Sequence, residues 1–159
     1  MLFRIADKSG YNVPNFDEFV FLPEPNIDYS QINYYTDLLR YYFFELKKNR
    51  LPRAWKRSSS PDNTAFGGHQ LEGDNLAVFP ENHILRHYIV LSENHARDKY
   101  LNRKFDRNDL STNWHGNRLN FTKDNLSLPS ESTFLHCLKR YDNKDFCKTK
   151  PLTKHFWEW

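Results

Sequence analysis

The sequence predicts an α/β domain in which a small mixed sheet is flanked by helices. Short runs rich in aromatic and β-branched residues, typical of strands, alternate with segments whose apolar residues recur at helical spacing. Aromatic residues make up 16% of the 159 residues, and this richness argues against a disordered chain. A chain of this length can bury a core of its own.

The N-terminal half predicts helices and strands in alternation. A short helix is expected over Met1–Ser9, followed by a strand over residues 16–22, which are rich in Phe and Val. Apolar residues at helical spacing then predict a helix over Tyr34–Lys47, closed by the basic residues that a helix C-terminus prefers. A short strand over Arg53–Arg57 and a flexible turn at Gly67-Gly68 complete this half.

The C-terminal half predicts two strands and two helices. Strands are expected over residues 76–79 and 83–91, on either side of Pro80, and a helix over Ser92–Phe105. A second helix is expected over Leu126–Tyr141, beginning near Pro129.

The aromatic tail sets the predicted domain organisation. Residues 156–159, Phe-Trp-Glu-Trp, need a surface to pack against if they are not to fray. We therefore divide the chain into residues 1–125 and a C-terminal helix and tail, residues 126–159, packed on the same domain.

The turn around Ser92 is the most informative segment. Ser92 stands at a helix N-cap position with Glu93 in the first turn. Free backbone N–H groups at such a turn favour an anion. Lys99 lies two turns along the same side of the helix, and Arg86 lies in the preceding apolar run. The pattern predicts a site for a charged ligand; the alternative is a capped amphipathic helix with a solvated basic face.

Charge and cysteine content limit the class of protein. The net charge of +3 is too small to demand a nucleic-acid partner. Between Arg86 and Arg118 there are seven Lys or Arg against four Asp or Glu, so the positive surplus lies around the predicted anion site. Only Cys137 and Cys147 are present, which favours reduced thiols in a cytoplasmic protein. No apolar run reaches the length of a membrane span.

Several short motifs follow one another along residues 5–118. They are Gly10-Tyr11-Asn12, Phe19-Val20-Phe21, Ala54-Trp55-Lys56, Gly67-Gly68-His69, Phe79-Pro80, His87-Tyr88 with Ser92 and Lys99, and Trp114-His115. Together they resemble the C-terminal part of bacterial glycosyltransferases of family 2. The resemblance implies a partial GT-A-like domain and the transfer of a sugar from a nucleotide-sugar donor to a glycan or other hydroxyl acceptor.

The resemblance also implies roles for individual residues. The donor phosphates are assigned to Arg86, Ser92 and Lys99, and a divalent metal, Mn or Mg, to His87. Four residues are assigned to the acceptor: His69, Trp114, His115 and Arg118. The catalytic base is not identified.

One feature of the family is missing from its expected place. Family members carry a donor-binding half with an Asp-x-Asp metal motif upstream, whereas here Asn15 stands two residues before Asp17. We therefore expect the acceptor-side portion of a truncated or split enzyme, with a separate donor-binding chain as a possible partner.

Two other classes of function stay open. The chain could be a non-catalytic module that binds a sugar or a nucleotide. The Gly67-Gly68-His69, Asn75-Leu76 and Asn82-His83 pieces also resemble parts of the His-Asn-His metal nucleases. That motif requires an Asp-His or His-His pair well upstream of the asparagine, and residues 1–68 contain no histidine.

Overall fold

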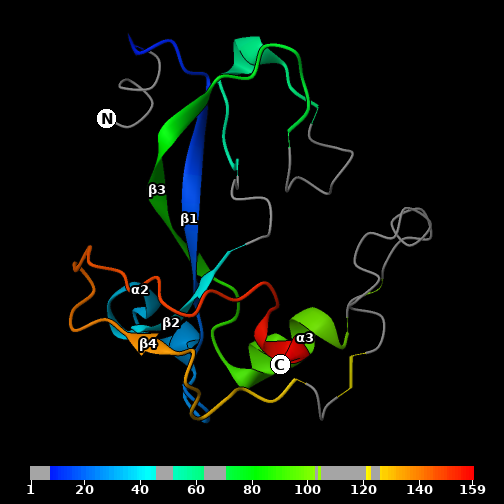
Figure 1. The fold of residues 1–159 in the computed structure, drawn as a ribbon. Coiled ribbons are helices and arrows are strands. Elements are labelled where there is room, and N and C mark those ends of the chain that lie inside the picture. The colour runs from blue at the N-terminus through cyan, green and yellow to red at the C-terminus, as the bar shows by residue number, and fades with distance from the viewer. Residues whose placement is uncertain (1–7, 46–51, 63–70, 103, 105–120, 123–125) are drawn as a thin grey trace. The chain divides into compact units, whose positions relative to one another are not determined.

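The computed structural model describes residues 8–45, 52–62, 71–102, 104, 121–122 and 126–159. This part of the chain is mixed α/β, with a small four-stranded mixed sheet and few helices. The strands are β1 (Val13–Phe21), β2 (Arg40–Phe44), β3 (Val78–Tyr88) and β4 (His136–Cys137), in the order β3-β1-β2-β4 (Figure 1). The helices longer than a single 3-10 turn are α2 (Tyr34–Asp37) and α3 (Glu93–Tyr100).

The chain divides into two compact units. The first consists of Met1–Glu18 and Glu45–Leu85, and the second of Phe19–Phe44 and Arg86–Trp159. Strands β1 and β3 each contribute residues to both units. The two units are described separately below.

Strand β1 confirms the predicted strand over residues 16–22 and begins three residues earlier. Eight of its nine residues are buried, so both faces of the strand are covered. The strand is also paired along both edges, with β3 on one side and β2 on the other. Its buried residues include the polar side chains of Asn15, Asp17 and Glu18 as well as apolar ones.

The predicted helix over Tyr34–Lys47 is wrong beyond its first turn. Helix α2 ends at Asp37, and the chain is already extended at Leu38. Four consecutive aromatic residues in β2, Tyr41 to Phe44, are all buried. A helix would point these four rings around its whole circumference, whereas a strand sends alternate rings to two covered faces. Burial of every ring therefore favours the strand.

An aromatic core forms on one face of β2 in the second unit. Its buried members are Phe19, Phe21, Tyr29, Leu38, Tyr41, Phe43 and Leu138. The Phe19 ring lies 5.2 Å from that of Phe43 and 4.3 Å from that of Phe146, centroid to centroid. Since an aromatic ring buries about 150–250 Å², these contacts dominate the energetics of the unit.

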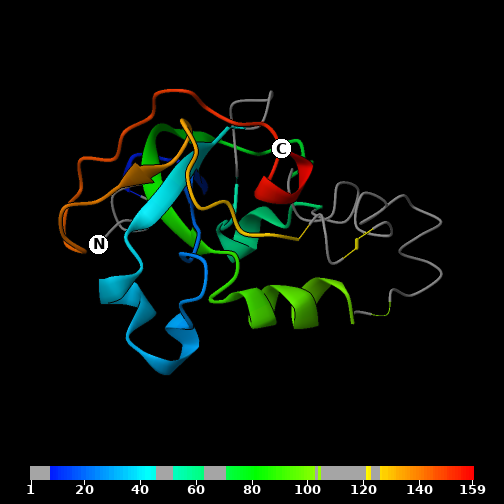
Figure 2. The same ribbon diagram turned by 90° about the horizontal axis from the view of Figure 1, so that it is seen from below.

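The predicted helix over Leu126–Tyr141 is also wrong. Strand β4 lies inside it and pairs antiparallel with β2, with Arg40 opposite Cys137 and Tyr41 opposite His136 (Figure 2). The Leu138 N–H donates to the Leu39 carbonyl at 3.0 Å. The backbone of this segment is therefore used for pairing between strands, and Leu138 packs on the aromatic core instead of on a helical neighbour.

Strand β3 replaces the two short strands predicted around Pro80. It runs without interruption from Val78 to Tyr88, and Pro80 is exposed within it. Proline lacks the N–H that a sheet ladder requires, so it is tolerated only where that group has no partner to bond. The position of β3 at the end of the strand order explains why the strand continues through Pro80.

The strand predicted over Arg53–Arg57 is wrong. Residues 52–56 have no regular structure, and Arg57–Ser59 form a single 3-10 turn. The Lys56 N–H donates to the Asn12 carbonyl, and Ser60 adopts a left-handed conformation with φ of 39°. The backbone turns away at this point instead of extending.

Helix α3 and the C-terminal tail belong to the second unit. Ser92 is the N-cap of α3, as predicted, and the helix ends at Tyr100. The tail forms a 3-10 helix over Phe156–Glu158, in which Phe156 and Trp157 are buried. The unit itself therefore supplies the surface that the aromatic tail needs. Among the residues described, none forms a helix long and apolar enough to cross a membrane.

Candidate ligand pocket

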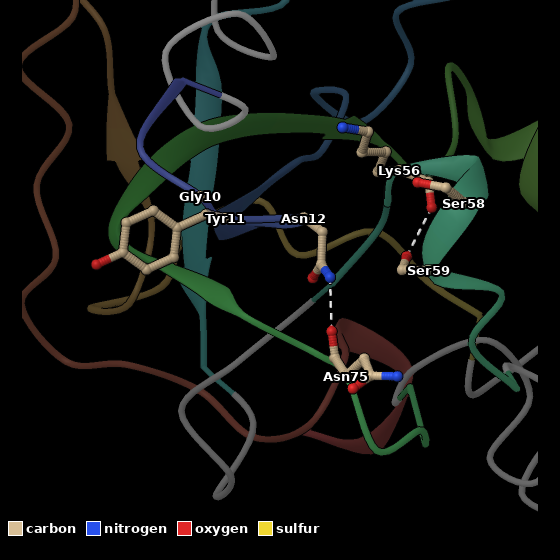
Figure 3. A pocket seen from close by; sticks show the side chains of 7 residues that line it. All are labelled: Gly10, Tyr11, Asn12, Lys56, Ser58, Ser59 and Asn75. Atoms are coloured by element: carbon tan, nitrogen blue, oxygen red, sulfur yellow. Dashed lines mark hydrogen bonds between the residues drawn. The ribbon is translucent and has the colours of Figure 1, made fainter.

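A polar pocket of about 290 Å³ lies in the first unit. Three segments line it, as Figure 3 shows: Gly10, Tyr11 and Asn12; then Lys56, Ser58 and Ser59; and Asn75. Because these segments are distant in sequence, the pocket depends on the contacts that hold them together.

Asn12 holds the three segments together. Its Nδ2 donates to the Asn75 carbonyl at 2.6 Å (Figure 3), and its Oδ1 accepts from the Ala77 N–H at 2.8 Å. Its own carbonyl accepts from the Lys56 N–H at 2.7 Å. The Asn12 side chain and backbone thus bond to both of the other segments.

Local turns position the remaining side chains of the pocket. Gly10 has φ of 79°, a conformation that residues with a Cβ seldom adopt, and it precedes Tyr11 at the start of the pocket. The Tyr11 ring packs edge-on against Phe79, with centroids 5.3 Å apart. The Ser59 hydroxyl donates to the Lys56 carbonyl at 2.6 Å and so closes the 3-10 turn.

The pocket offers hydrogen-bonding groups and one positive charge. Lys56 contributes an ammonium group, Ser58 and Ser59 contribute hydroxyls, and Asn75 contributes an amide. None of the seven lining residues is acidic. A ring, a cation and several hydroxyl and amide groups suit a small ligand that carries hydroxyl groups or an anionic group.

A buried polar cluster lies along β1 in the same unit. The Asn15 Nδ2 donates to Asn82 Oδ1 at 2.6 Å, and the Asn82 Nδ2 donates to Asp17 Oδ1 at 2.8 Å. The Glu18 carboxylate is only 2% exposed and lies 3.7 Å from the Arg53 guanidinium. A carboxylate that is buried and paired in this way is closed to substrate. We therefore interpret Glu18 as a structural group and not as a general base.

The predicted anion-site residues each make a defined contact in the second unit. Arg86 donates through Nη2 to the carbonyls of Tyr141 and Asn143. The Ser92 Oγ accepts the His95 N–H at 3.1 Å, as an N-cap hydroxyl does. The Lys99 ammonium donates to the Ile89 carbonyl at 2.6 Å. Each polar group thus also stabilises the chain where β3 leads into α3.

His87, to which the resemblance assigns a divalent metal, is half-buried near the end of β3. Among the described residues, no three His, Cys, Asp or Glu side chains gather where they could hold a metal ion. The assignment of a metal to His87 therefore rests on the resemblance alone. The His83 ring, needed by the nuclease alternative, stacks on Phe79 at 5.6 Å.

The four residues assigned to the acceptor lie outside the described residues. They are His69, Trp114, His115 and Arg118. The pocket is lined by residues for which the sequence predicted no role in sugar transfer, among them Ser58, Ser59 and Asn75. The signal in the sequence that points to the pocket is the resemblance of the Gly10-Tyr11-Asn12 and Ala54-Trp55-Lys56 motifs to family 2 enzymes, because both motifs contribute lining residues.

Comparison with known proteins adds no relative. No protein-family model matches the chain, and neither the curated proteins nor the solved structures contain a match. The functional argument therefore depends on the residues and their geometry.

Proposed function

We propose that this chain contributes the acceptor side of a glycosyltransferase, which moves a sugar from a nucleotide-sugar donor to a hydroxyl acceptor. The observation that carries the proposal is the composition of the pocket. Gly10-Tyr11-Asn12 and Lys56 belong to two of the motifs that resemble family 2 enzymes, and both line the same polar pocket. Separate motifs that meet at one pocket favour a shared role in ligand binding.

The chemistry of the pocket supports a sugar as the ligand. Sugars present hydroxyl groups at their edges and C–H groups on their faces. The hydroxyl and amide groups of Ser58 and Asn75 suit the first, and the Tyr11 ring suits the second. Pockets for small ligands begin at about 300 Å³, so a volume of about 290 Å³ suits a single sugar residue.

The rest of the assignment is part of the same proposal. The donor phosphates are proposed to bind Arg86, Ser92 and Lys99, and the positive charges of Arg86 and Lys99 would stabilise the leaving nucleotide diphosphate. His87 is proposed as a metal ligand. The proposed acceptor-binding residues are His69, Trp114, His115 and Arg118. The free thiols of Cys137 and Cys147 support a reducing compartment, the cytoplasm.

The proposal is tested by titrating the chain with methyl glycosides of common hexoses and following backbone amide resonances. We expect shifts at Asn12 and Asn75 and a dissociation constant that rises at least tenfold in Lys56→Met. This rise corresponds to the loss of a hydrogen bond from a charged donor, about 1.5–3 kcal/mol. Lys144→Met, which removes an exposed lysine of the second unit, is the matched control. Equal effects of both substitutions, or no shift at the pocket, would contradict the proposal.

A non-catalytic sugar-binding module is the second candidate. It is favoured by the absence of a carboxylate among the pocket residues, because sugar transfer requires a base near the acceptor hydroxyl. The two candidates differ in turnover. Release of nucleoside diphosphate from a nucleotide-sugar, measured with saturating glycoside and with a donor-binding chain added, favours the enzyme; binding without release favours the module.

A further inference from the structure

Four tyrosines gather on the surface of the second unit. Tyr34, Tyr35 and Tyr141 are 42%, 48% and 41% exposed. Tyr88, which is half-buried, lies with its ring centroid 4.9 Å from that of Tyr34 and 6.5 Å from that of Tyr35. The Tyr35 and Tyr141 rings are 6.0 Å apart. We call these four residues together with Arg86 the tyrosine–arginine cluster.

The Arg86 guanidinium lies among rings of the cluster and of the core. Its central carbon is 5.1 Å from the Tyr35 ring centroid and 5.3 Å from that of Phe146. Its Nη2 is occupied by two backbone carbonyls, but its Nη1 is buried and makes no hydrogen bond to any residue that the structure describes. No ion pair within the described part of the chain involves Arg86.

The Tyr88 hydroxyl is a second buried group, and its proton has no acceptor among the described residues, because the neighbouring Arg86 guanidinium can only donate. Burial raises the pKa of Tyr88 above its ordinary value, although interaction with the Arg86 side chain and the charge of Arg86 oppose that shift. The hydroxyl therefore keeps its proton at neutral pH and can donate it to an acceptor. A buried donor without an acceptor is costly, and two of them close together indicate a place for a ligand that carries an acceptor.

We propose that the tyrosine–arginine cluster binds a sugar ring that carries an anionic group. The anion lies on Arg86 and Tyr88, and the C–H face of the ring lies on Tyr35 and Tyr141. The anionic group is a carboxylate, as in a uronic acid, or a phosphate, as in the sugar phosphate of a nucleotide-sugar. Both share the same chemistry at Arg86, because a guanidinium binds either group through parallel hydrogen bonds.

The angles between the rings favour a sugar over a flat base. Tyr35 and Tyr141 are inclined by 60°, and Tyr34 and Tyr88 by 69°. A planar base stacks well on only one member of such a pair. A puckered sugar ring has C–H groups directed to more than one side, so it can contact both.

Tyr35 controls access to the guanidinium. Its ring covers Arg86 and is 48% exposed, and the contacts of its side chain are with rings and with Arg86. Turning it aside therefore breaks no hydrogen bond among the described residues. A cation–π contact at an exposed ring is weaker than a hydrogen bond between charged groups, so exchange of one for the other favours the anion.

This inference deepens the proposed function, since it keeps the anion contact of Arg86 and adds recognition of the sugar ring by tyrosines. The two can fail separately, because the cluster belongs to the second unit and the pocket to the first. Lys56→Met weakens glycoside binding at the pocket and should leave binding at the cluster unchanged.

The test uses the full chain and calorimetric titration with glucuronate, glucose 1-phosphate, glucose, acetate and inorganic phosphate. We expect glucuronate, glucose 1-phosphate or both to bind at least tenfold more tightly than glucose, acetate or inorganic phosphate. Whichever of the two binds more tightly identifies the anionic group. Equal binding of acetate or phosphate alone would reduce the cluster to an anion contact and overturn the proposal.

Variants of Tyr35 test ligand binding at the tyrosine–arginine cluster even if substitution of Arg86 affects folding. Tyr35→Ala should weaken binding of the preferred ligand about tenfold, whereas Tyr35→Phe, which keeps the ring, should leave it nearly unchanged. Arg86→Lys should reduce the preference for the charged ligand over glucose. Phe134→Ala, at a ring that is 38% exposed outside the cluster, is the control. Undiminished binding in both Tyr35→Ala and Arg86→Lys would refute the site.

Discussion

The stability of the second unit should depend strongly on Trp157 and only weakly on Trp159. Trp157 is 7% exposed, and its ring lies 4.9 Å from Tyr100 of α3 and 5.6 Å from Phe121. Trp159, two residues further on, is 42% exposed and contacts the Tyr42 ring at 5.2 Å. The same substitution at the two positions therefore compares a buried indole with a half-covered one.

The expected size of the effect follows from the buried area. An indole that buries about 200 Å² contributes about 5 kcal/mol at about 25 cal/mol per Å². Residual compactness of the unfolded chain lowers this figure to about 3–4 kcal/mol, within the range of about 3–5 kcal/mol for Trp→Ala in cores. Trp159→Ala loses a partly wet ring and an exposed hydrogen bond to the Lys154 carbonyl, about 1 kcal/mol in all.

The assay is urea unfolding followed by far-UV circular dichroism, with a calorimetric melting curve for each variant. For a chain of this size about 3–4 kcal/mol lowers the melting temperature by about 6–16 °C, and about 1 kcal/mol by about 2–4 °C. Trp157→Phe should recover part of the loss because it keeps a ring against Tyr100. Equal losses in the two alanine variants would refute the view that the tail is an integral part of the unit.

Three further predictions concern single groups. Ser92→Ala should destabilise the chain by about 1 kcal/mol in urea unfolding, because the His95 N–H loses its cap, whereas Ser92→Asp should keep most of the stability. Hydrogen bonds from the Thr149 hydroxyl and backbone lower the pKa of the Cys147 thiol, so iodoacetamide should alkylate Cys147 faster than Cys137 below pH 9. Thr149→Val, which removes the hydroxyl and keeps the backbone N–H, should reduce the difference in peptide mass spectra. Burial raises the pKa of Tyr41 above its ordinary value of 10. The contribution of Tyr41 to the free energy of unfolding should therefore be complete below pH 10 and be lost as the pH rises through the raised pKa. In pH-dependent urea unfolding, a Tyr41→Phe variant should lose less stability over that range than the unchanged protein.

The sequence predicts well those elements whose signal is local. Ser92 has an N-cap side chain followed by an acidic first turn, and the cap forms as expected. The Phe- and Val-rich composition of residues 16–22 is enough to identify β1. In both cases the residues that determine the structure are neighbours in the chain, so no distant partner has to be known.

The failures occur where a distant partner decides. Tyr34, Leu38, Tyr41 and Phe44 are spaced as in a helix, yet the intervening rings Tyr42 and Phe43 are buried as well, and only a strand between two covered faces satisfies all of them. The segment around Leu138 follows β2 for the same reason. The pocket was missed because Asn12 bonds residues more than sixty positions away, and that pairing leaves no local pattern.

The two-faced burial of β2 has a consequence for folding inside the cell. Tyr41 and Phe43 join the aromatic core, whereas Tyr42 contacts His155 and Trp159, and Phe44 stacks on His155 at 4.2 Å and bridges to Leu152. During synthesis the residues that cover the second face, such as Leu152 and His155, are added more than a hundred positions after Phe44. Until then Arg40–Phe44 is a short, strongly β-prone segment with one charge, the type that joins other chains. Loss of the tail should therefore be seen first as aggregation of new chains, before any defect in ligand binding can be measured.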